Sequence, residues 1–442
     1  MTTTGRPKLS VIGTGYLGAT HAVCMTELGF EVVGLDIDPT KIAKLRAGEV
    51  PFFEPGLGEL LRKNLETGRL HFTASYEEVA DFADVHFICV GTPQKRGEYA
   101  ADLTYVDTAF AALARRLARR SLVVGKSTVP AGTAARLAEL VAALAPCPDV
   151  EVAWNPEFLR EGYAVEDTLH PDRLVFGVRS PWAEEQLRAA FAPVIATGVP
   201  VIVTDFATAE LVKVAANSFL ATKISFINAM AEVCEVTHAD VTKLAEALGH
   251  DNRIGRRFLN AGLGFGGGCL PKDIRAFMAR AGELGVDQAL TFLKDVDAIN
   301  MRRRARVVEL GLELVDGSYV GTKVCVFGAA FKPNSDDIRD SPALDVAATI
   351  QRYGAQVRVY DPAAMDNARR LHPELTYADT AQEAATGADL VLLLTEWSEF
   401  RQMDPARLGQ TVSHSRIVDG RNCLDPAVWR AAGWTYRALG RQ

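Results

Sequence analysis

The clearest structural pattern in this chain lies at residues 8–36, KLSVIGTGYLGATHAVCMTELGFEVVGLD. An apolar run at 8–12 leads into Gly13-Thr14-Gly15-Tyr16-Leu17-Gly18, a helical pattern covers 16–28, and a second apolar run at 31–36 ends at Asp36. A strand, a glycine turn and a helix in this order bring backbone N–H groups and a helix N-terminus to a place where they can bind a pyrophosphate. Asp36 can bind a ribose 2′-hydroxyl and would repel a 2′-phosphate, which favours NAD over NADP. We therefore predict that this segment binds NAD.

The alternation of strands and helices continues toward residue 203. Apolar runs at 83–93 and 121–130 end in turn residues and flank a helical stretch at 104–119, and residues 173–178 and 199–203 can supply further strands. Such alternation predicts a parallel sheet with helices on both faces.

The pattern changes after Thr204. Residues 205–248 contain no proline and no glycine and are dominated by Ala, Leu, Val and Lys. This predicts one long helix from about Phe206, followed by a shorter one. Helical patterns continue at 271–284 and 291–314.

A second α/β pattern then follows. KVCVFGAAF at 323–331 is typical of a strand that ends in a glycine turn, and AQVRVYDP, after a helical segment, ends a strand at Asp361. ADLVLLLTEW and SRIVDGRN match the later strands of the first unit. We predict an α/β fold with two Rossmann-like parallel-sheet domains joined by a long central helical segment, with boundaries at 1–203, 204–314 and 315–442.

Composition narrows the function classes. A chain of 442 residues predicts two to three domains at about 100–200 residues each. Its 48 basic and 55 acidic residues give a net charge of 48 − 55 = −7, which disfavours nucleic acid or an anionic membrane as the main partner. No apolar run approaches the roughly 20 residues that span a bilayer, and the polar segment Met1–Lys8 does not resemble a signal peptide. We expect a cytoplasmic protein.

The seven cysteines are scattered and include no C-x-x-C pair, and the eight histidines show no metal-ligand spacing, so we predict no metal site. Cys269 differs from the others because it lies between the glycine-rich run 262–268 and Pro271-Lys272-Asp273. Pro271 suits the first turn of a helix, so Cys269 would precede a helix N-terminus, where the dipole and Lys272 favour its thiolate. The run of glycines lets the backbone approach a ligand closely. We predict a nucleophilic cysteine.

Three other groups have competing interpretations. Lys213 and Asn217 lie four residues apart on one helical face, and they could form a solvated stripe, a core pair, or a cation and an amide presented to an oxygen. Residues 155–162 have the pattern of a helix N-terminus, in which Asn155 caps the helix and Glu157 and Glu161 lie on the same helical face. Cations in 331–339 and Arg421 could bind phosphates or belong to solvated loops.

Taken together, the motifs resemble the UDP-glucose/GDP-mannose dehydrogenase family over nearly the whole chain. The motifs that carry the resemblance occur in family order: G-x-G-Y-x-G, V-G-T-P (90–93), S-T-V-P-x-G-T (127–133), N-P-E-F-L-R-E-G, K-x-x-x-N, G-F-G-G-x-C-L-P-K-D, F-K-P-N-x-D-D-I-R-x-S-P and D-G-R-N (419–422). The chain departs from the family at Gly268, where the family commonly has serine.

The resemblance implies an enzyme that oxidises a nucleotide sugar at its C6 alcohol to a carboxylate with two NAD⁺, with UDP-glucose as the first candidate and UDP-glucuronate as the product. By this resemblance Cys269 would form a thiohemiacetal and then a thioester. Lys213 and Asn217 would stabilise the oxyanion, Asp273 would act with a water as base, and Glu157 and Thr128 would assist.

The resemblance also implies ligand contacts, with residues 315–442 as a nucleotide-sugar-binding domain. The implied NAD contacts, besides the glycine motif, are Asp36, Lys41, Thr92, Thr128, Glu161, Lys272 and Arg339. The implied substrate contacts are Glu157, Phe158, Leu159, Arg160, Glu161, Lys213, Asn217, Phe258, Leu259, Asn260, Ala261, Gly262, Gly266, Phe331, Lys332 and Arg421, and Arg253 would reach the sugar nucleotide of a neighbouring subunit. A homodimer or higher homo-oligomer built on the long helix is expected.

Three alternatives stay open at this point. The first is the same chemistry on another nucleotide sugar, such as a UDP-N-acetylhexosamine or GDP-mannose. The second is a non-catalytic nucleotide-sugar-binding protein, and the third is an ordinary two-electron dehydrogenase, which would leave Cys269 without a role.

Overall fold

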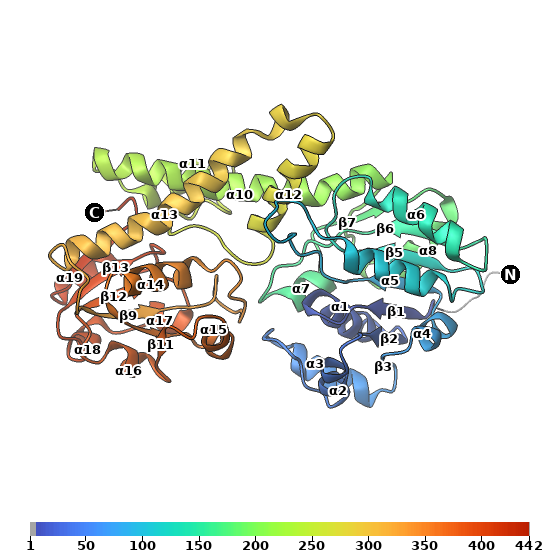
Figure 1. Ribbon diagram of the computed structural model, residues 1–442, viewed down its shortest axis with the longest axis horizontal. Helices are drawn as coiled ribbons and strands as arrows, with labels where there is room; N and C mark the ends of the chain where they lie inside the picture. The colour runs from blue at the N-terminus through green and yellow to red at the C-terminus, as the bar shows by residue number, and fades with distance from the viewer. Residues whose placement is uncertain (1–5, 442) are drawn as a thin grey trace. The chain divides into compact units, whose positions relative to one another are not determined.

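The computed structural model describes residues 6–441, so the first five residues of the predicted polar N-terminus lie outside it. The chain divides into two compact units (Figure 1). The first contains the chain up to Ala216 together with Arg275–Leu284, and the second contains Asn217–Ile274 together with the chain from Gly285 onward. Among the described residues, no helix combines the length and the apolar character that a membrane span needs.

The first unit is built on an eight-stranded sheet in the order β3-β2-β1-β4-β5-β6-β7-β8. Its strands are β1 (Leu9–Ile12), β2 (Val32–Leu35), β3 (Leu70–Thr73), β4 (Val85–Ile88), β5 (Leu122–Gly125), β6 (Glu151–Trp154), β7 (Leu174–Gly177) and β8 (Val201–Thr204). Its helices are α1 (Tyr16–Glu27), α2 (Pro39–Arg46), α3 (Leu57–Glu66), α4 (Tyr76–Phe82), α5 (Thr104–Ala114), α6 (Thr133–Leu144), α7 (Ala164–Leu169), α8 (Pro181–Ala190) and α9 (Ala192–Ile195).

Successive side chains of a strand point to opposite faces of the sheet, and here both faces pack in buried cores. Leu9 and Val11 of β1 pack in one buried cluster, whereas Ile12 packs in another. All strand pairs are parallel except β6 and β7, which meet in an antiparallel pair at Trp154 and Gly177. The predicted doubly covered sheet is confirmed, with this one antiparallel pair as a correction. The helix predicted at 104–119 ends earlier, at Ala114.

The long helix α10 (Phe206–Thr237) runs from the first unit into the second (Figure 1). Its uninterrupted length follows from the lack of glycine and proline in this stretch. It is followed by α11 (Val241–Gly249), α12 (Leu270–Glu283), the short 3₁₀ helix η1 (Asp287–Leu290) and α13 (Phe292–Leu314). The predicted long helix and shorter successor are confirmed.

The second unit contains a six-stranded, wholly parallel sheet in the order β11-β10-β9-β12-β13-β14. Its strands are β9 (Lys323–Phe327), β10 (Gln356–Tyr360), β11 (Thr376–Tyr377), β12 (Leu390–Leu393), β13 (Arg416–Asp419) and β14 (Thr435–Ala438). Its helices are α14 (Pro342–Arg352), α15 (Met365–Leu371), α16 (Ala381–Ala385), α17 (Ser398–Arg401), α18 (Pro405–Gly409) and α19 (Pro426–Ala431). The strand order has the Rossmann pattern, and the prediction of two Rossmann-like domains joined by a long helix is confirmed.

Candidate active site

The glycine turn after β1 has the geometry of a dinucleotide site. Gly13 has φ +88°, and a side chain there would strike Val90, while Gly18 packs its Cα directly against the carbonyl of Gly13. Gly15 precedes the first residue of α1, and a Cβ added to it would meet no protein atom within 4 Å. The turn is therefore tightly packed on its inner side and open at the helix N-terminus, which fits a pyrophosphate.

Asp36 lies at the end of β2 beside this turn. Its Oδ2 accepts hydrogen bonds from the backbone N–H of Thr14 at 2.9 Å and from the Thr14 hydroxyl at 3.2 Å, and the Lys41 amine lies 3.6 Å from the same oxygen. A carboxylate held here fits the predicted contact with a ribose. Thr92 and Thr128 also meet, because the Thr92 hydroxyl donates to the Thr128 carbonyl at 2.9 Å.

The glycine turn of the second unit differs in a way that decides its ligand. Asp361 occupies the place that Asp36 has in the first unit and is buried more deeply, at 1% exposed against 6% for Asp36. It accepts hydrogen bonds from five donors, which are the backbone N–H groups of Ala329, Ala330, Ala363 and Ala364 and the indole N–H of Trp397. The Thr395 side chain packs against Gly328. Protein groups surround the Asp361 carboxylate and fill the turn at Gly328. The glycine turn of the first unit is therefore the better site for the dinucleotide.

Residues 155–160 have no regular secondary structure, and α7 begins only at Ala164. The prediction of a helix N-terminus at 155–162 is therefore wrong. Asn155 does not cap a helix, because its side chain is buried, accepts from Lys126 Nζ at 2.8 Å and donates to the Val175 carbonyl at 3.0 Å. Glu157 and Glu161 consequently do not share a helical face.

Glu54 and Tyr16 hold the far end of this segment. The Glu54 carboxylate accepts from the backbone N–H groups of Gly162 at 2.7 Å and Ala164 at 2.8 Å, and also from the Tyr16 hydroxyl. Tyr16 is the first residue of α1, and burial raises its pKa. The glycine turn and the end of the 155–162 segment are thus joined by hydrogen bonds within the first unit.

Within this segment, Glu157 meets Lys213 of α10. Lys213 Nζ lies 3.2 Å from Glu157 Oε1, and both side chains are largely buried. The centre of the Phe158 ring lies 3.8 Å from the Arg173 guanidinium carbon and 5.6 Å from Lys213 Nζ. The Arg160 side chain is committed to a bidentate pair with Asp167, at 2.9 and 2.6 Å.

In the second unit, Cys269 directly precedes the N-terminus of α12, as predicted. Its carbonyl accepts the first helical hydrogen bond, from Asp273 N at 2.9 Å. The Asp273 carboxylate is buried and binds the Asn217 amide at 2.6 Å and the Lys272 amine at 2.7 Å. Asn217, Lys272 and Asp273 therefore form one cluster beside the residue that carries the thiol.

Cys269 is the exposed member of the seven cysteines, and none of the seven is in a disulfide. Burial raises the pKa of the Cys24 thiol and of the Cys89 thiol to about 12, which makes these groups inert near neutral pH. An exposed thiol at a helix N-terminus is the one suited to nucleophilic attack.

The glycine run before Cys269 is packed against the protein rather than open. A Cβ would lie 2.4 Å from Asn300 Oδ1 at Gly264, 2.3 Å from the Asp340 carbonyl at Gly266, and 2.7 Å from the Phe331 ring at Gly267. At Gly268 it would lie 2.1 Å from the Arg339 guanidinium carbon. The backbone of these four glycines is therefore closely approached, as predicted. The groups that approach it are protein groups and not a ligand.

Arg421 holds the glycine run before Cys269 in place. Its guanidinium donates to three backbone carbonyls, those of Leu394 at 2.8 Å, Gly264 at 3.0 Å and Phe331 at 3.1 Å. The structure thus assigns Arg421 contacts within the protein. Lys332 Nζ lies 5.3 Å from the centre of the Phe331 ring.

The predicted substrate stretch 258–262 is only partly accessible. Leu259 and Ala261 are buried and pack their side chains in a core with Ile227, and their carbonyls accept hydrogen bonds from Arg256 and Asn422. Phe258 has φ +65°. Asn260 is exposed, and Gly262 N donates to Asn228 Oδ1 at 2.9 Å. Arg253 is largely exposed and pairs with Asp251.

Sequence reasoning missed Lys126 and Glu54. A lysine at the carboxyl end of the apolar strand SLVVG was a usable signal for Lys126, because a cation there lies where ligands of parallel sheets bind. No sequence pattern predicts the role of Glu54, because its partners are backbone groups that are distant in sequence.

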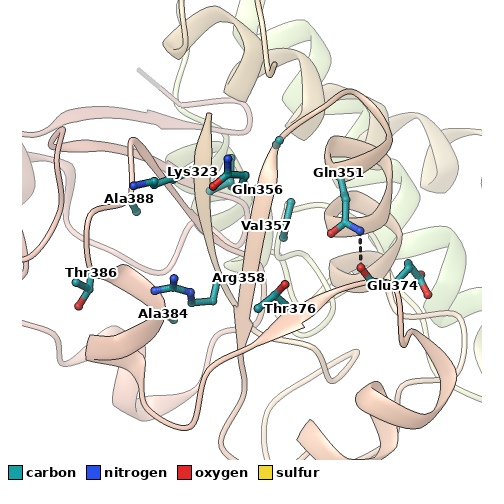
Figure 2. A pocket seen from close by; sticks show the side chains of 12 residues that line it. Lys323, Gln351, Gln356, Val357, Arg358, Glu374, Thr376, Ala384, Thr386 and Ala388 are labelled. Atoms are coloured by element: carbon teal, nitrogen blue, oxygen red, sulfur yellow. Dashed lines mark hydrogen bonds between the residues drawn. The ribbon is translucent and has the colours of Figure 1, made fainter. Parts of the chain in front are cut away.

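Two cavities lie away from these residues. One, of about 430 Å³, lies where β9 and β10 begin, and Lys323, Gln356 and Arg358 line it together with Gln351 and Glu374 (Figure 2). The other, of about 250 Å³, lies in the first unit beside Gly132. Neither is lined by a residue of the predicted site, so cavity size does not identify the site.

Comparison with known proteins identifies the domains. Models of the UDP-glucose/GDP-mannose dehydrogenase family match residues 7–195 as the NAD binding domain, 207–302 as the central domain and 325–426 as the UDP binding domain. The UDP-glucose 6-dehydrogenase of Rhizobium meliloti (strain 1021) is 41% identical over 436 residues, covering 98% of this chain and 99% of that protein.

Solved structures agree. A UDP-glucose dehydrogenase from the hyperthermophilic archaeon Pyrobaculum islandicum is 39% identical with a TM-score of 0.91, and the match covers 100% of both chains. A UDP-D-ManNAc dehydrogenase from Pyrococcus horikoshii is 28% identical with a TM-score of 0.86, covering 98% of this chain and 99% of that one.

Proposed function

The chain belongs to the UDP-glucose/GDP-mannose dehydrogenase family, and we propose that it oxidises UDP-glucose at C6 to UDP-glucuronate through a covalent intermediate on Cys269. The observation that carries the proposal is an exposed cysteine that directly precedes the N-terminus of α12, next to the Asn217–Asp273–Lys272 cluster. An ordinary dehydrogenase has no need for such a thiol. The binding-protein alternative would leave the buried polar cluster beside the thiol without a role.

The chemistry explains the residue types. When bound, NAD⁺ accepts a hydride in each of two oxidations. The Cys269 thiolate adds to the carbon of the aldehyde formed first, giving a tetrahedral thiohemiacetal. Loss of hydride from that carbon to NAD⁺, and of the hydroxyl proton to a base, leaves a thioester, and water cleaves it to the carboxylic acid and the free thiol.

Charged groups near the thiol and in the first unit suit the proton transfers. The Asn217 amide and the Lys213 amine are proposed to stabilise the negative oxygen of the reacting carbon. Asp273, fixed by Asn217 and Lys272, is proposed to act with a water as base. Glu157, paired with Lys213, and Thr128 are proposed to assist.

Ligand contacts follow the same division. We propose that the open glycine turn, Asp36, Lys41 and Thr92 hold NAD, with Glu161, Lys272 and Arg339 as further contacts. The sugar nucleotide is proposed to contact Phe258 and Asn260 of the predicted 258–262 stretch, together with Phe331 and Lys332, whereas the protein itself encloses Leu259, Ala261, Gly262 and Gly266. For Arg421 we propose a supporting contact, because three carbonyls of the protein engage its guanidinium.

The assay for substrate and electron count is direct. Purified protein is given NAD⁺ with UDP-glucose, a UDP-N-acetylhexosamine or GDP-mannose, and NADH is counted by absorbance against sugar consumed. We expect two NADH per UDP-glucose. One NADH would indicate the two-electron dehydrogenase, none would indicate the binding protein, and turnover of GDP-mannose alone would overturn the choice of sugar.

Cys269→Ser tests the nucleophile. We expect loss of nearly all turnover with NAD binding preserved, because the hydroxyl is a far weaker nucleophile while the glycine turn is untouched. Cys147→Ser, at a half-buried cysteine of the first unit, is the matched control and should keep wild-type turnover. Wild-type turnover by Cys269→Ser would refute the covalent scheme.

We also propose that two copies associate through α10 and work in the cytoplasm. Phe219, Phe226 and Val233 recur every seven residues on this helix and are 66%, 48% and 49% exposed. An exposed apolar stripe with this spacing is typical of a helix–helix interface. Phe226→Glu should convert a dimer to a monomer in sedimentation, and an unchanged mass would reject this interface. None of the seven cysteines forms a disulfide, which fits a reducing compartment.

A further inference from the structure

Lys126 is a buried lysine that the proposed chemistry does not use. It follows β5 directly and is 5% exposed. Its Nζ lies 5.8 Å and 5.6 Å from the centres of the Phe87 and Phe191 rings. Removing an ammonium group from water is costly, and a purely structural position between two rings would be filled better by an apolar side chain. A lysine here therefore calls for a specific partner.

That partner is Asn155, which three hydrogen bonds hold in place. Lys126 Nζ donates to Asn155 Oδ1 at 2.8 Å. The Asn155 amide donates to the Val175 carbonyl at 3.0 Å, and its backbone N–H donates to the Gly125 carbonyl at 2.8 Å. Asn155 is 1% exposed, so each of its polar groups depends on these partners rather than on water.

The anchored residue begins the irregular segment that carries Glu157. Because residues 155–160 belong to no helix or strand, the position of Glu157 depends on the two ends of the segment and on the hydrogen bond that its carboxylate accepts from Leu159 N at 2.7 Å. Lys126 fixes the first end, two residues before Glu157, and Glu54 fixes the other end at Gly162. The Glu157–Lys213 distance of 3.2 Å is therefore set in part by Lys126.

Charge links the same groups. Burial lowers the pKa of Lys126, while the Cys89 thiol and the Glu157 carboxylate act against burial and the Lys213 amine acts with it. Lys126 is thus close enough to the Glu157–Lys213 pair to interact electrostatically with both members.

We propose that Lys126 is a positioning residue for the reaction, which acts through Asn155 to hold Glu157 against Lys213. The inference rests on the proposed function, in which Lys213 stabilises the reacting oxygen and Glu157 assists. Lys126 itself touches neither the thiol nor the glycine turn in this account.

The test replaces Lys126 by methionine, which fills the space between the rings and removes the donor. We expect kcat for UDP-glucose to fall at least about tenfold, because small displacements of catalytic groups carry losses of this size. The dissociation constant for NAD should change less than about twofold, since the glycine turn keeps its contacts. Lys243→Met, at an exposed lysine of α11, is the control and should behave as wild type.

Asn155→Ala tests the same link from the other side. It should lower kcat similarly, and the double variant should be no slower than the worse single variant, because both changes break one connection. If Lys126→Met does not fold, Asn155→Ala, which leaves the lysine in place, carries the prediction. Lys126→Arg, which can still donate to Asn155, should recover most of kcat.

Three results would overturn the inference. They are wild-type kcat in Lys126→Met, independent losses that add in the double variant, and an equal loss of kcat and NAD affinity, which would indicate general damage to the fold. A failure of the proposed function is seen separately, because the wild-type protein would then not produce two NADH per UDP-glucose.

Discussion

Gly264→Ala should destabilise the loop that carries Cys269. Gly264 has φ +100°, a region that a residue with a side chain adopts only at a cost. The added methyl would lie 2.4 Å from Asn300 Oδ1 and 3.0 Å from the Asn300 carbonyl. Asn300 is fully buried, accepts from Phe265 N at 2.7 Å and donates to the Phe265 carbonyl at 3.0 Å. The substitution therefore forces either the backbone or this pair of hydrogen bonds to move.

Two terms give the magnitude. Left-handed backbone strain costs about 1–2 kcal/mol for a residue with a Cβ. A buried hydrogen-bonding group that loses its partner costs about 1–3 kcal/mol. We expect Gly264→Ala to lower the free energy of unfolding by about 2–5 kcal/mol, because the two terms act together.

Urea unfolding followed by circular dichroism measures this difference, and the rate of Cys269 alkylation reports whether the loop has moved. Gly282→Ala is the matched control, since a Cβ there meets no atom within 4 Å and alanine favours a helix. It should leave stability unchanged or raise it by up to about 1 kcal/mol. A loss below about 0.5 kcal/mol for Gly264→Ala would refute the packing argument.

Three further predictions concern single side chains. Asp36→Ala should raise the dissociation constant for NAD about tenfold and reduce the preference for NAD over NADP, as measured by titration with each cofactor. Unchanged affinities would show that Asp36 does not contact the cofactor. Gly268→Ser should displace only the flexible end of Arg339, so it should cost less than about 1 kcal/mol of stability and keep turnover; unfolding of this variant would show that the guanidinium cannot move. Although burial raises the pKa of Glu235, hydrogen bonds from Arg303 and Arg306 outweigh it and keep the pKa below its ordinary 4.5. The stability that this carboxylate contributes is therefore present above pH 4.5 and lost as the pH falls through the lowered pKa, so the stability advantage of wild type over Glu235→Gln should shrink below pH 4.5 in urea unfolding, and a pH-independent difference would contradict the pairing.

Local patterns were sufficient to predict the two α/β units. The strand, glycine turn and helix at 8–28 depend on residues close in sequence, and so does α10, which has no helix-breaking residue along its length. The position of Cys269 before α12 was also predictable, because Pro271 restricts where the helix can begin.

Long-range hydrogen bonds explain what the sequence could not predict. Asn155-Pro156-Glu157 has the composition of a helix start, but Lys126, which follows the neighbouring strand β5, binds the side chain that would have capped the helix. Asp36 and Asp361 end equivalent strands, and only the structure reveals that five donors enclose the second. Such differences depend on partners that are distant in sequence.

The proposed mechanism requires a covalent intermediate on Cys269, which mass spectrometry of the Cys269 peptide can detect. Asp273→Asn, which removes the proposed base, should slow thioester hydrolysis, and the reaction with UDP-glucose and NAD⁺ is quenched in acid. We expect an added mass on the Cys269 peptide equal to the acyl group of the oxidised sugar nucleotide, and no added mass when NAD⁺ is omitted. Formation of two NADH per sugar with no adduct on Cys269 would contradict it.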